Sequence, residues 1–196
     1  MDDMIVDDPH QLFESWMAEA EKSEPTDPNA MTVATVGANG QPSARILLLK
    51  GHDARGFVFY TNMESRKGLE IQKNPRAALL FHWKSLGRQI RIEGPISQVS
   101  DEEADAYFDS RARMSRIGAW ASEQSRPLES RAALMARVAE LEKRFEGQEP
   151  PRPERWRGSR VAPESIEFWQ NGDYRLHDRI VYTASGGGWT AKRLYP

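Results

Sequence analysis

The sequence predicts a mainly β (α+β) protein: an antiparallel β-barrel with helices around its outside. Strand-like apolar patterns dominate residues 31–99, where one short helix interrupts them, and residues 160–194, whereas the other predicted helices lie at the start of the chain and between those regions. Turn sequences such as Asn39-Gly40 and the glycine run 186–188 connect consecutive strands directly. Such short connections are typical of antiparallel pairing, so a single barrel with peripheral helices is the predicted architecture.

The first half of the chain begins with a helix. Asp8 is the expected N-cap, Pro9 takes the first helical position, and apolar residues recur at helical spacing over 12–20. The strand predicted over 43–50 has four apolar residues in succession, so we expect both of its faces to be buried. The other elements predicted here are strands over 31–36, 56–61 and 77–83, and a short helix from Ser65 to about Asn74.

The second half places helices before further strands. Ser100 with Glu103 three residues later forms a capping box, which predicts a helix to about residue 110. The proline-rich segment 148–155 is an expected loop. The other elements predicted here are strands over 89–99, 160–169, 175–183 and 189–194, and helices over 114–122 and 127–145.

Length and composition limit the class of protein. At roughly 150 residues per domain, 196 residues predict one domain, over 9–196, after a disordered acidic segment 1–8. Absence of cysteine excludes disulfide scaffolds and thiol nucleophiles. There is no apolar run of about 20 residues and no basic-then-apolar start, so we expect a cytoplasmic protein with no membrane partner.

The charge distribution favours a small anionic ligand. Residues 1–30 carry nine acids and one base, and 20 of the 27 bases in the chain are arginine. Arginine binds phosphate and carboxylate through a planar fork, but the excess charge is too small to predict a nucleic-acid partner. The four histidines have no metal-ligand spacing, so no metal is expected. Rossmann, P-loop and hydrolase-elbow motifs are missing.

Two clusters of basic residues are candidate anion sites. In a strand, Arg175, His177 and Arg179 would project to one face at intervals of about 6.6 Å. The alternative is a solvated strand end. The segment Ser65-Arg66-Lys67 would place a hydroxyl and two cations at a helix N-terminus, which suits a phosphate. The alternative there is an N-cap beside two exposed bases.

Three further groups are weaker candidates. Strand parity puts Arg45 and Lys50 on opposite faces, so one ligand atom would not meet both. The pair Gln124-Ser125 either contacts a heterocycle or caps a helix. Tyr107 and Arg111 are four residues apart and would share a helix face, with Ser115 beyond the helix end; a solvated face is the alternative.

These motifs, in this order, resemble the pyridoxine/pyridoxamine 5′-phosphate oxidase family, and the resemblance covers roughly residues 9–196. It implies a split antiparallel β-barrel of the FMN-binding type and a homodimer with FMN at the subunit interface. The motifs that carry it are Arg45-Ile-Leu-Leu-Leu-Lys50, Phe59-Tyr-Thr61, Ser65-Arg-Lys67, Arg88-Gln89, Tyr107-Phe-Asp-Ser-Arg111, Ile117-Gly-Ala-Trp120, Gln124-Ser125, Ile166-Glu-Phe-Trp169, Arg175-Leu-His-Asp-Arg179 and Arg193-Leu-Tyr-Pro196.

Site residues are carried over by position from the same resemblance. Gln124, Ser125, Trp169 and Arg179 are expected to serve the flavin bound mainly by the other subunit. The implied FMN contacts are Arg45, Ile46, Leu47, Leu48, Leu49, Lys50, Tyr60, Thr61, Arg66, Lys67, Gln89, Gln124, Ser125, Trp169 and Arg179. The implied substrate contacts are Lys50, Tyr107, Arg111, Ser115, Arg175, Leu176 and His177, with Arg175 and His177 as the catalytic pair.

The resemblance implies an FMN-dependent oxidase. It would convert the phosphorylated pyridines pyridoxine 5′-phosphate and pyridoxamine 5′-phosphate to pyridoxal 5′-phosphate, by hydride transfer from C4′ to the flavin. Molecular oxygen would be the electron acceptor and hydrogen peroxide the product. Two alternatives remain open at this stage: a split-barrel flavin reductase with another substrate, and a non-catalytic module that binds FMN or pyridoxal phosphate. Two departures from the family pattern are the short acidic start and Ala112, which replaces a common proline.

Overall fold

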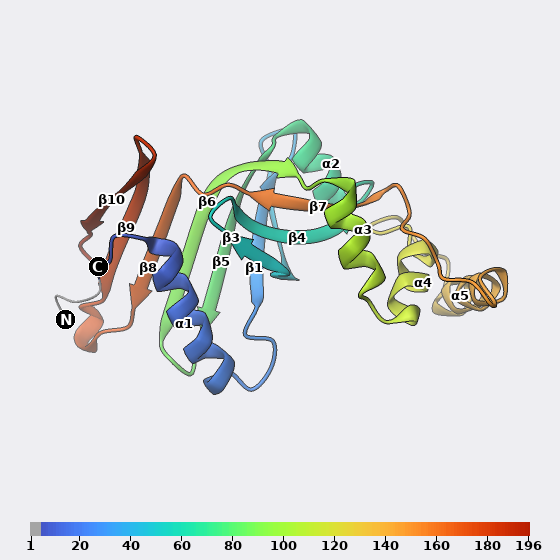
Figure 1. The fold of residues 1–196 in the computed structure, drawn as a ribbon, viewed down its shortest axis with the longest axis horizontal. Coiled ribbons are helices and arrows are strands. Elements are labelled where there is room, and N and C mark those ends of the chain that lie inside the picture. Colours follow the sequence, from blue (N-terminus) through green and yellow to red (C-terminus); the bar gives the residue numbers. More distant parts are fainter. Residues whose placement is uncertain (1–4) are drawn as a thin grey trace.

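The computed structural model describes residues 5–196, which form an antiparallel sheet with helices at its sides (Figure 1). The main path of the sheet runs in the order β10-β9-β8-β6-β5-β1-β2. The strands are β1 (Ala30–Val36), β2 (Pro42–Leu48), β3 (Gly51–Asp53), β4 (Gly56–Asn62), β5 (Arg76–Trp83), β6 (Arg88–Gln98), β7 (Trp156–Val161), β8 (Ser165–Gln170), β9 (Asp178–Ser185) and β10 (Gly188–Arg193). The helices are α1 (Pro9–Ser23), α2 (Arg66–Lys73), α3 (Asp101–Asp109), α4 (Arg113–Ala121) and α5 (Arg131–Arg144).

The long strand β6 curls the sheet toward a barrel. Residues 88–93 of β6 pair with β8, whereas Ile96–Gln98 at its other end pair with β7. Strand β7 then pairs with β4, and β4 with β3, so a second group of strands crosses the end of the main sheet (Figure 1). This arrangement confirms the predicted antiparallel barrel with peripheral helices.

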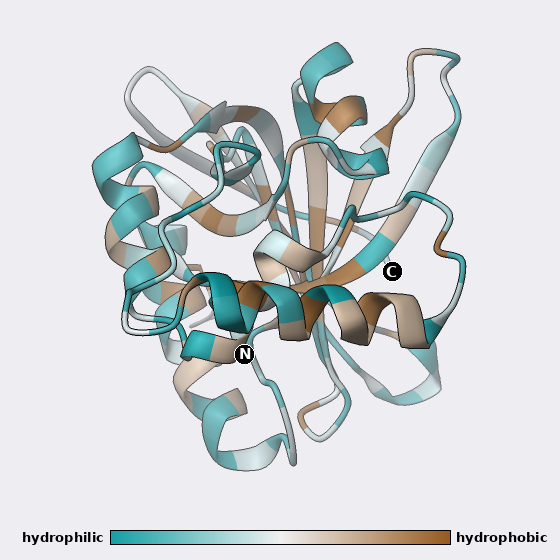
Figure 2. Ribbon diagram, turned by 90° about the vertical axis from the view of Figure 1, so that its right-hand side faces the viewer, coloured by the Kyte–Doolittle hydropathy of each residue, from teal (hydrophilic) through white to brown (hydrophobic). Residues whose placement is uncertain are grey.

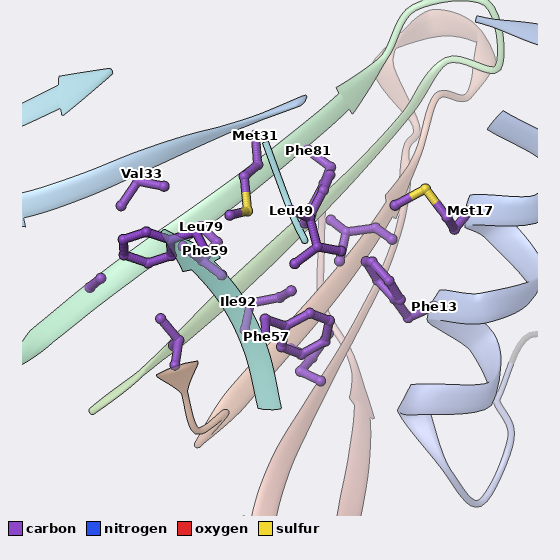
Figure 3. Packing of buried hydrophobic residues seen from close by; sticks show 14 of the residues in the cluster. Phe13, Met17, Met31, Val33, Leu49, Phe57, Phe59, Leu79, Phe81 and Ile92 are labelled. Carbon is purple, nitrogen blue, oxygen red and sulfur yellow. The ribbon is translucent and has the colours of Figure 1, made fainter. Parts of the chain in front are cut away.

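Helix α1 closes the inner face of the sheet. Asp8 accepts a hydrogen bond from the amide of His10 at 2.9 Å, and Pro9 opens the helix, as predicted. Phe13 and Trp16 are 0% and 3% exposed, and Phe13 points from α1 into the cluster around Phe57 and Phe81 (Figure 3). Burying a large apolar side chain contributes about 2–3 kcal/mol, so this face holds α1 against the sheet.

The predicted strand over 160–169 is wrong because the structure divides it. Strand β7 ends at Val161 and β8 begins at Ser165, with Pro163 in the link. Proline has no N–H with which to continue a ladder. The break lets β7 pair with β4 while β8 pairs with β9, so each half joins a different part of the sheet.

The expectation that strand 43–50 is buried on both faces is also wrong. Strand β2 ends at Leu48 and is the last strand of the main path, with β1 as its one neighbour there. Ile46 is therefore 64% exposed on this chain. Strand β3 was not predicted, because its three residues are too few to carry a period-two pattern.

The helix starts at Ser65 and Ser100 are confirmed by their caps. Each serine side chain accepts an amide hydrogen bond from the residue three positions later. The start predicted for the last helix at residue 127 is wrong, because Ser130 caps α5 and the helix begins at Arg131. Helix α5, nearest the viewer in Figure 2, alternates brown and teal turns, as a half-exposed helix should.

The ends of the described chain add two observations. Residues 1–4 of the predicted disordered segment lie outside the described residues, and the amide of Val6 donates to the Tyr182 hydroxyl at 3.0 Å. Across residues 5–196, none of the helices has the length and apolar character needed to cross a bilayer.

Candidate cofactor and substrate site

A buried lysine lies just inside the N-terminus of α2. Lys67 is 6% exposed, and its ammonium donates to Gln124 Oε1 at 2.7 Å, Thr61 Oγ1 at 3.0 Å and Ser65 Oγ at 3.3 Å. All three acceptors are neutral oxygens, so they satisfy its N–H groups without cancelling its charge. The structure thus brings Gln124 to the segment 61–67, so two distant parts of the chain meet around one cation.

The environment of Lys67 changes its titration. Burial disfavours the charged ammonium, and Arg45 repels it, so the pKa of Lys67 falls from 10.5 to about 8 despite the attraction of Glu70. A dianionic phosphate placed beside this group would stabilise the ammonium. Arg66, Gln124 and Ser125 line a surface cavity that also contains Glu64 and Glu70, and Gln124 connects this cavity to Lys67.

The buried carboxylate of Glu70 organises the arginines on the same side of α2. Its Oε2 accepts from Thr35 Oγ1 at 2.5 Å and Ser43 Oγ at 2.6 Å, and lies 3.3 Å from Arg45 Nη2. Its Oε1 accepts from Arg66 Nε at 2.9 Å. One carboxylate thus holds side chains from β1, β2 and α2 in a single network.

The same network fixes the charge of Glu70. Burial alone would raise its pKa, but hydrogen bonds from Ser43, Thr35 and Arg66 outweigh burial and lower the pKa to about 2. The parity expected between Arg45 and Lys50 does not apply, because β2 ends at Leu48 and Lys50 lies in the link to β3. Arg45 turns toward Glu70 while Lys50 is exposed.

An aromatic cluster lies on β4, α3 and β7. The Tyr60 ring is nearly parallel to those of Tyr107 and Trp156, with centroids 4.1 and 5.0 Å away and interplanar angles of 16° and 9°. Gly158 faces Tyr60 across the strand pair, where a built Cβ would come within 2.7 Å of the Tyr60 ring. A glycine at this position is what lets the ring lie flat over β7.

Arg111 lies against this cluster but not on the helix face that the spacing predicted. Helix α3 ends at Asp109, and the amide of Arg111 donates to Phe108 O in the following turn. The turn puts the Arg111 guanidinium carbon 5.0 Å from the centroid of the Trp156 ring and 5.6 Å from that of Phe108. The prediction that Tyr107 and Arg111 share a helix face is therefore wrong, although both side chains reach the same aromatic cluster.

The charge of Arg111 has no carboxylate partner among residues 5–196. Its Nη1 is buried without a hydrogen bond, and desolvation lowers its pKa, partly offset by Tyr107. A buried donor left unpaired costs about 1–3 kcal/mol, which an incoming anion would relieve. This cation is the clearest feature of the chain that calls for an external ligand.

Three other predicted contacts lie on the outer face of the main sheet. Gln89, Trp169 and Arg179 occupy opposed positions on β6, β8 and β9 and line one cavity. Glu167, 6% exposed, accepts from Arg179 Nε at 2.8 Å and from Arg91 Nη2 at 2.5 Å. The buried carboxylate of Glu167 therefore orients the Arg179 guanidinium on this face of the sheet.

The predicted strand start at Arg175 is wrong. Residues Asp173–Arg175 form a 3-10 turn, β9 begins only at Asp178, and Tyr174 and Arg175 have φ of 56° and 65°. The even spacing of Arg175, His177 and Arg179 on one face is therefore lost. Left-handed backbone at two successive non-glycine residues is uncommon and costs free energy, and such strain concentrates at functional sites.

His177 is oriented by its own loop. Its Nδ1 accepts from the Gly172 amide at 3.2 Å, so in the neutral ring Nε2 carries the proton and is a donor. The ring centroid lies 4.5 Å from that of Trp169. Arg175 and Leu176 are exposed, as are Lys50 and Ser115. No group of metal-binding side chains occurs within residues 5–196.

Comparison with known proteins decides the family. Residues 17–145 match the family described as pyridoxamine 5′-phosphate oxidase, and residues 156–196 match the pyridoxine 5′-phosphate oxidase C-terminal dimerisation region. The chain belongs to the pyridoxamine 5′-phosphate oxidase family. The resemblance predicted from the sequence motifs is thereby confirmed, and membership supports FMN as the cofactor.

Relatives in this oxidase family match almost the whole chain. Proteins named pyridoxine/pyridoxamine 5′-phosphate oxidase from Gluconobacter oxydans and Zymomonas mobilis are 61% and 53% identical to it. The matches cover 96% and 98% of this chain, and 94% and 100% of the relatives.

Solved structures confirm the split-barrel fold of the oxidase family. PhzG from Burkholderia lata, solved with tetrahydrophenazine-1-carboxylic acid, has a TM-score of 0.93 and 34% identity, covering 100% of this chain and 95% of PhzG. An FMN-binding protein from Nostoc punctiforme, covering 98% of this chain and 100% of its own, has a TM-score of 0.78 at 16% identity and supports the fold alone.

Sequence reasoning missed four residues that shape this oxidase-family site. Glu70 had one available signal, its i+4 spacing from Arg66 on α2. Glu167 had another, because it alternates with Trp169 along a strand. Trp156 and Gly158 had no signal, since they lie between the loop predicted over 148–155 and the strand predicted from residue 160, and their pairing with β4 is a long-range contact.

Proposed function

We propose that this protein oxidises pyridoxine 5′-phosphate and pyridoxamine 5′-phosphate to pyridoxal 5′-phosphate. Oxygen is the acceptor and hydrogen peroxide the product; with the amine substrate, water also enters and ammonia leaves. The observation that carries the proposal is Arg111, a half-buried cation with an unpaired donor beside Tyr107. Such a group suits a phosphorylated substrate. Relatives that share 53–61% of their residues with this chain bear the name of the same activity.

The residues near α2 fit the phosphate of FMN. Lys67 is a buried cation with neutral partners, Ser65 begins a helix whose dipole favours an anion, and Arg66 lies at the mouth of the adjoining cavity. Gln124 contacts Lys67 of its own chain. This contact favours binding of Gln124 to the same FMN as Lys67, rather than to the FMN of the other subunit.

The outer sheet face fits the other end of the cofactor. Trp169 offers an apolar surface, and Arg179, held by Glu167, offers a directed cation. Within one chain these residues line a cavity different from that near α2. A homodimer, supported by the C-terminal dimerisation region, would allow the two halves to come from different subunits.

The substrate is positioned by the aromatic cluster and the strained loop. When bound, FMN supplies the two-electron acceptor that no side chain provides. Tyr107 and Arg111 hold the phosphate, together with Lys50 and Ser115. His177 offers a donor at Nε2 and orients a substrate oxygen. Arg175 approaches the ring from the loop, and this positioning reduces the entropy lost at the barrier.

A second candidate function comes from the similarity to PhzG. That structure contains a tetrahydrophenazine carboxylic acid, which has no phosphate. Its carboxylate is also an anion that the unpaired Arg111 could bind, with one negative charge where a phosphate carries up to two. The two functions therefore differ in whether turnover requires a phosphorylated substrate.

One experiment separates these functions. The purified protein is inspected for bound flavin, and peroxide formation under air is measured with pyridoxamine 5′-phosphate, pyridoxamine and a tetrahydrophenazine carboxylic acid. We expect flavin, and peroxide with the phosphorylated substrate only. A colourless protein would contradict the cofactor, flavin with no peroxide would indicate a reductase or binding module, and peroxide with the phenazine alone would indicate the second function.

Replacing Arg175 should affect turnover rather than cofactor binding. Arg175→Ala is expected to lower kcat about 100-fold, as removal of one positioned donor in an active site does, while the Kd of FMN stays within about twofold. The measurements are peroxide formation and flavin fluorescence titration. The matched control is Arg131→Ala on exposed α5. Equal losses of turnover and flavin affinity would remove Arg175 from its assigned role.

The lowered pKa of Lys67 predicts a pH dependence of FMN affinity. Below pH 8 the ammonium is already formed, so affinity should not depend on this group. Above pH 8 binding must take up a proton, and affinity should fall up to about tenfold per pH unit until the pKa of the complex is reached. Flavin titrations between about pH 7 and pH 10 test this. A flat profile, or the same slope in Lys67→Met, would contradict it.

A further inference from the structure

We propose that Trp156 is a positioning residue for the substrate phosphate, acting through Arg111. This inference rests on the proposed function and assigns a role to a residue that contacts neither the phosphate nor the flavin in that proposal. Trp156 opens β7 and is 7% exposed. It contacts Tyr60 on β4, which is proposed to bind the flavin, and both Tyr107 on α3 and Arg111 after α3, which are proposed to bind the phosphate.

The contacts of Arg111 make its dependence on Trp156 unusual. Most arginines of this chain are held by carboxylates or carbonyl groups, as Arg179 is by Glu167. Arg111 instead lies over the faces of Trp156 and Phe108, and no hydrogen bond or ion pair holds its side chain within residues 5–196. Aromatic faces attract a guanidinium without neutralising it. The charge remains available for a dianion while the side chain is held in place.

The same ring also orients Tyr107. The Tyr107 and Trp156 rings are nearly parallel at 9°, with centroids 6.0 Å apart, and Tyr60 stacks on both. Phe108 meets Trp156 edge-on at 5.0 Å and thereby fixes the indole from the α3 side. Two of the four proposed phosphate ligands, Tyr107 and Arg111, therefore depend on one indole. Its removal should weaken phosphate binding without touching the reacting carbon.

The test is a graded series at position 156 in the flavin-loaded protein. The KM for pyridoxine 5′-phosphate should rise about threefold in Trp156→Phe and about tenfold in Trp156→Leu, a factor equal to about 1.4 kcal/mol. The kcat and the Kd of FMN should change less than about twofold. Inorganic phosphate, as a competitive inhibitor, should lose affinity by the same factors. A purely structural role would lower the melting temperature and leave the KM of the folded protein unchanged.

A double-mutant cycle tests the route through Arg111. In the Trp156→Phe background, Arg111→Ala should raise KM by a smaller factor than in the unaltered protein, because the two changes remove one interaction. Ser115→Ala, at a proposed phosphate contact outside the aromatic cluster, should keep its full effect and is the control. If the increase in KM in the double variant equals the product of the increases in the two single variants, the inference is overturned. An unchanged KM and phosphate affinity in the folded variants would also overturn it.

The outcome is separable from failure of the proposed function. If the unaltered protein oxidises no phosphorylated pyridine, the proposed function fails on that measurement alone. Inorganic phosphate binding, followed by calorimetry, still compares Trp156→Phe with the unaltered protein. If Trp156→Leu does not fold, Trp156→Phe retains an aromatic ring and carries both the KM comparison and the cycle.

Discussion

Lys67→Met should reduce the affinity for FMN about 100-fold. A charge-assisted hydrogen bond contributes about 1.5–3 kcal/mol, and Lys67 is the buried cation nearest the start of α2. Methionine keeps the apolar stem that packs in the site and removes only the ammonium. Because burial disfavours that ammonium in the absence of ligand, the flavin-free variant should be as stable as the unaltered protein or more stable.

The measurement for Lys67 is the Kd of FMN from flavin fluorescence, with urea unfolding of the flavin-free protein as the companion. Lys143→Met, on the exposed surface of α5, is the matched control and should leave both unchanged. A Kd within threefold of the unaltered value would show that Lys67 does not bind the flavin phosphate. If Lys67→Met lowers both the stability of the flavin-free protein and its affinity for FMN, the main role of Lys67 is to stabilise the fold.

Glu70→Ala should lower the free energy of unfolding by about 3 kcal/mol. Removing one partner of a buried ion pair leaves the other charge uncompensated and costs about 3–5 kcal/mol. The lower end applies because Arg66 is largely exposed and can turn to water, whereas Arg45 is 20% exposed and cannot. Thr35 and Ser43 lose their shared acceptor in the same change.

The measurement for Glu70 is urea unfolding at fixed protein concentration and equal flavin occupancy, because bound ligand adds to stability. Glu64→Ala, an exposed acid close to Arg126, is the control and should change stability by less than about 0.5 kcal/mol. Glu70→Gln should retain part of the network, so its loss of unfolding free energy should lie between those of Glu70→Ala and Glu64→Ala. A loss in Glu70→Ala no larger than in Glu64→Ala would contradict the network.

The lowered pKa of Glu70 also predicts how its contribution to stability depends on pH. The folded value of about 2 lies below the ordinary value of 4.5, so the contribution is complete above about pH 4.5 and is lost as pH falls toward 2. The difference in stability between the unaltered protein and Glu70→Gln should therefore narrow on acidification within this window.

The sequence by itself determined the local elements and the family. Caps at Asp8, Ser65 and Ser100 act within three residues of the helix that they start, so their signals are complete in a short window. The same holds for strand alternation over residues 77–83. The order of short motifs was enough to indicate the family, which the matches over 17–145 and 156–196 then confirmed.

The tertiary structure alone decided how the candidate site is assembled. Pairing of β4 with β7 places Trp156 beside Tyr60, and the turn after α3 delivers Arg111 to the same ring. The left-handed backbone at Arg175 breaks the alternation that its spacing suggested. Burial and partners from distant segments set the pKa of Lys67. Such properties depend on contacts between residues far apart along the chain, so a local residue pattern does not predict them.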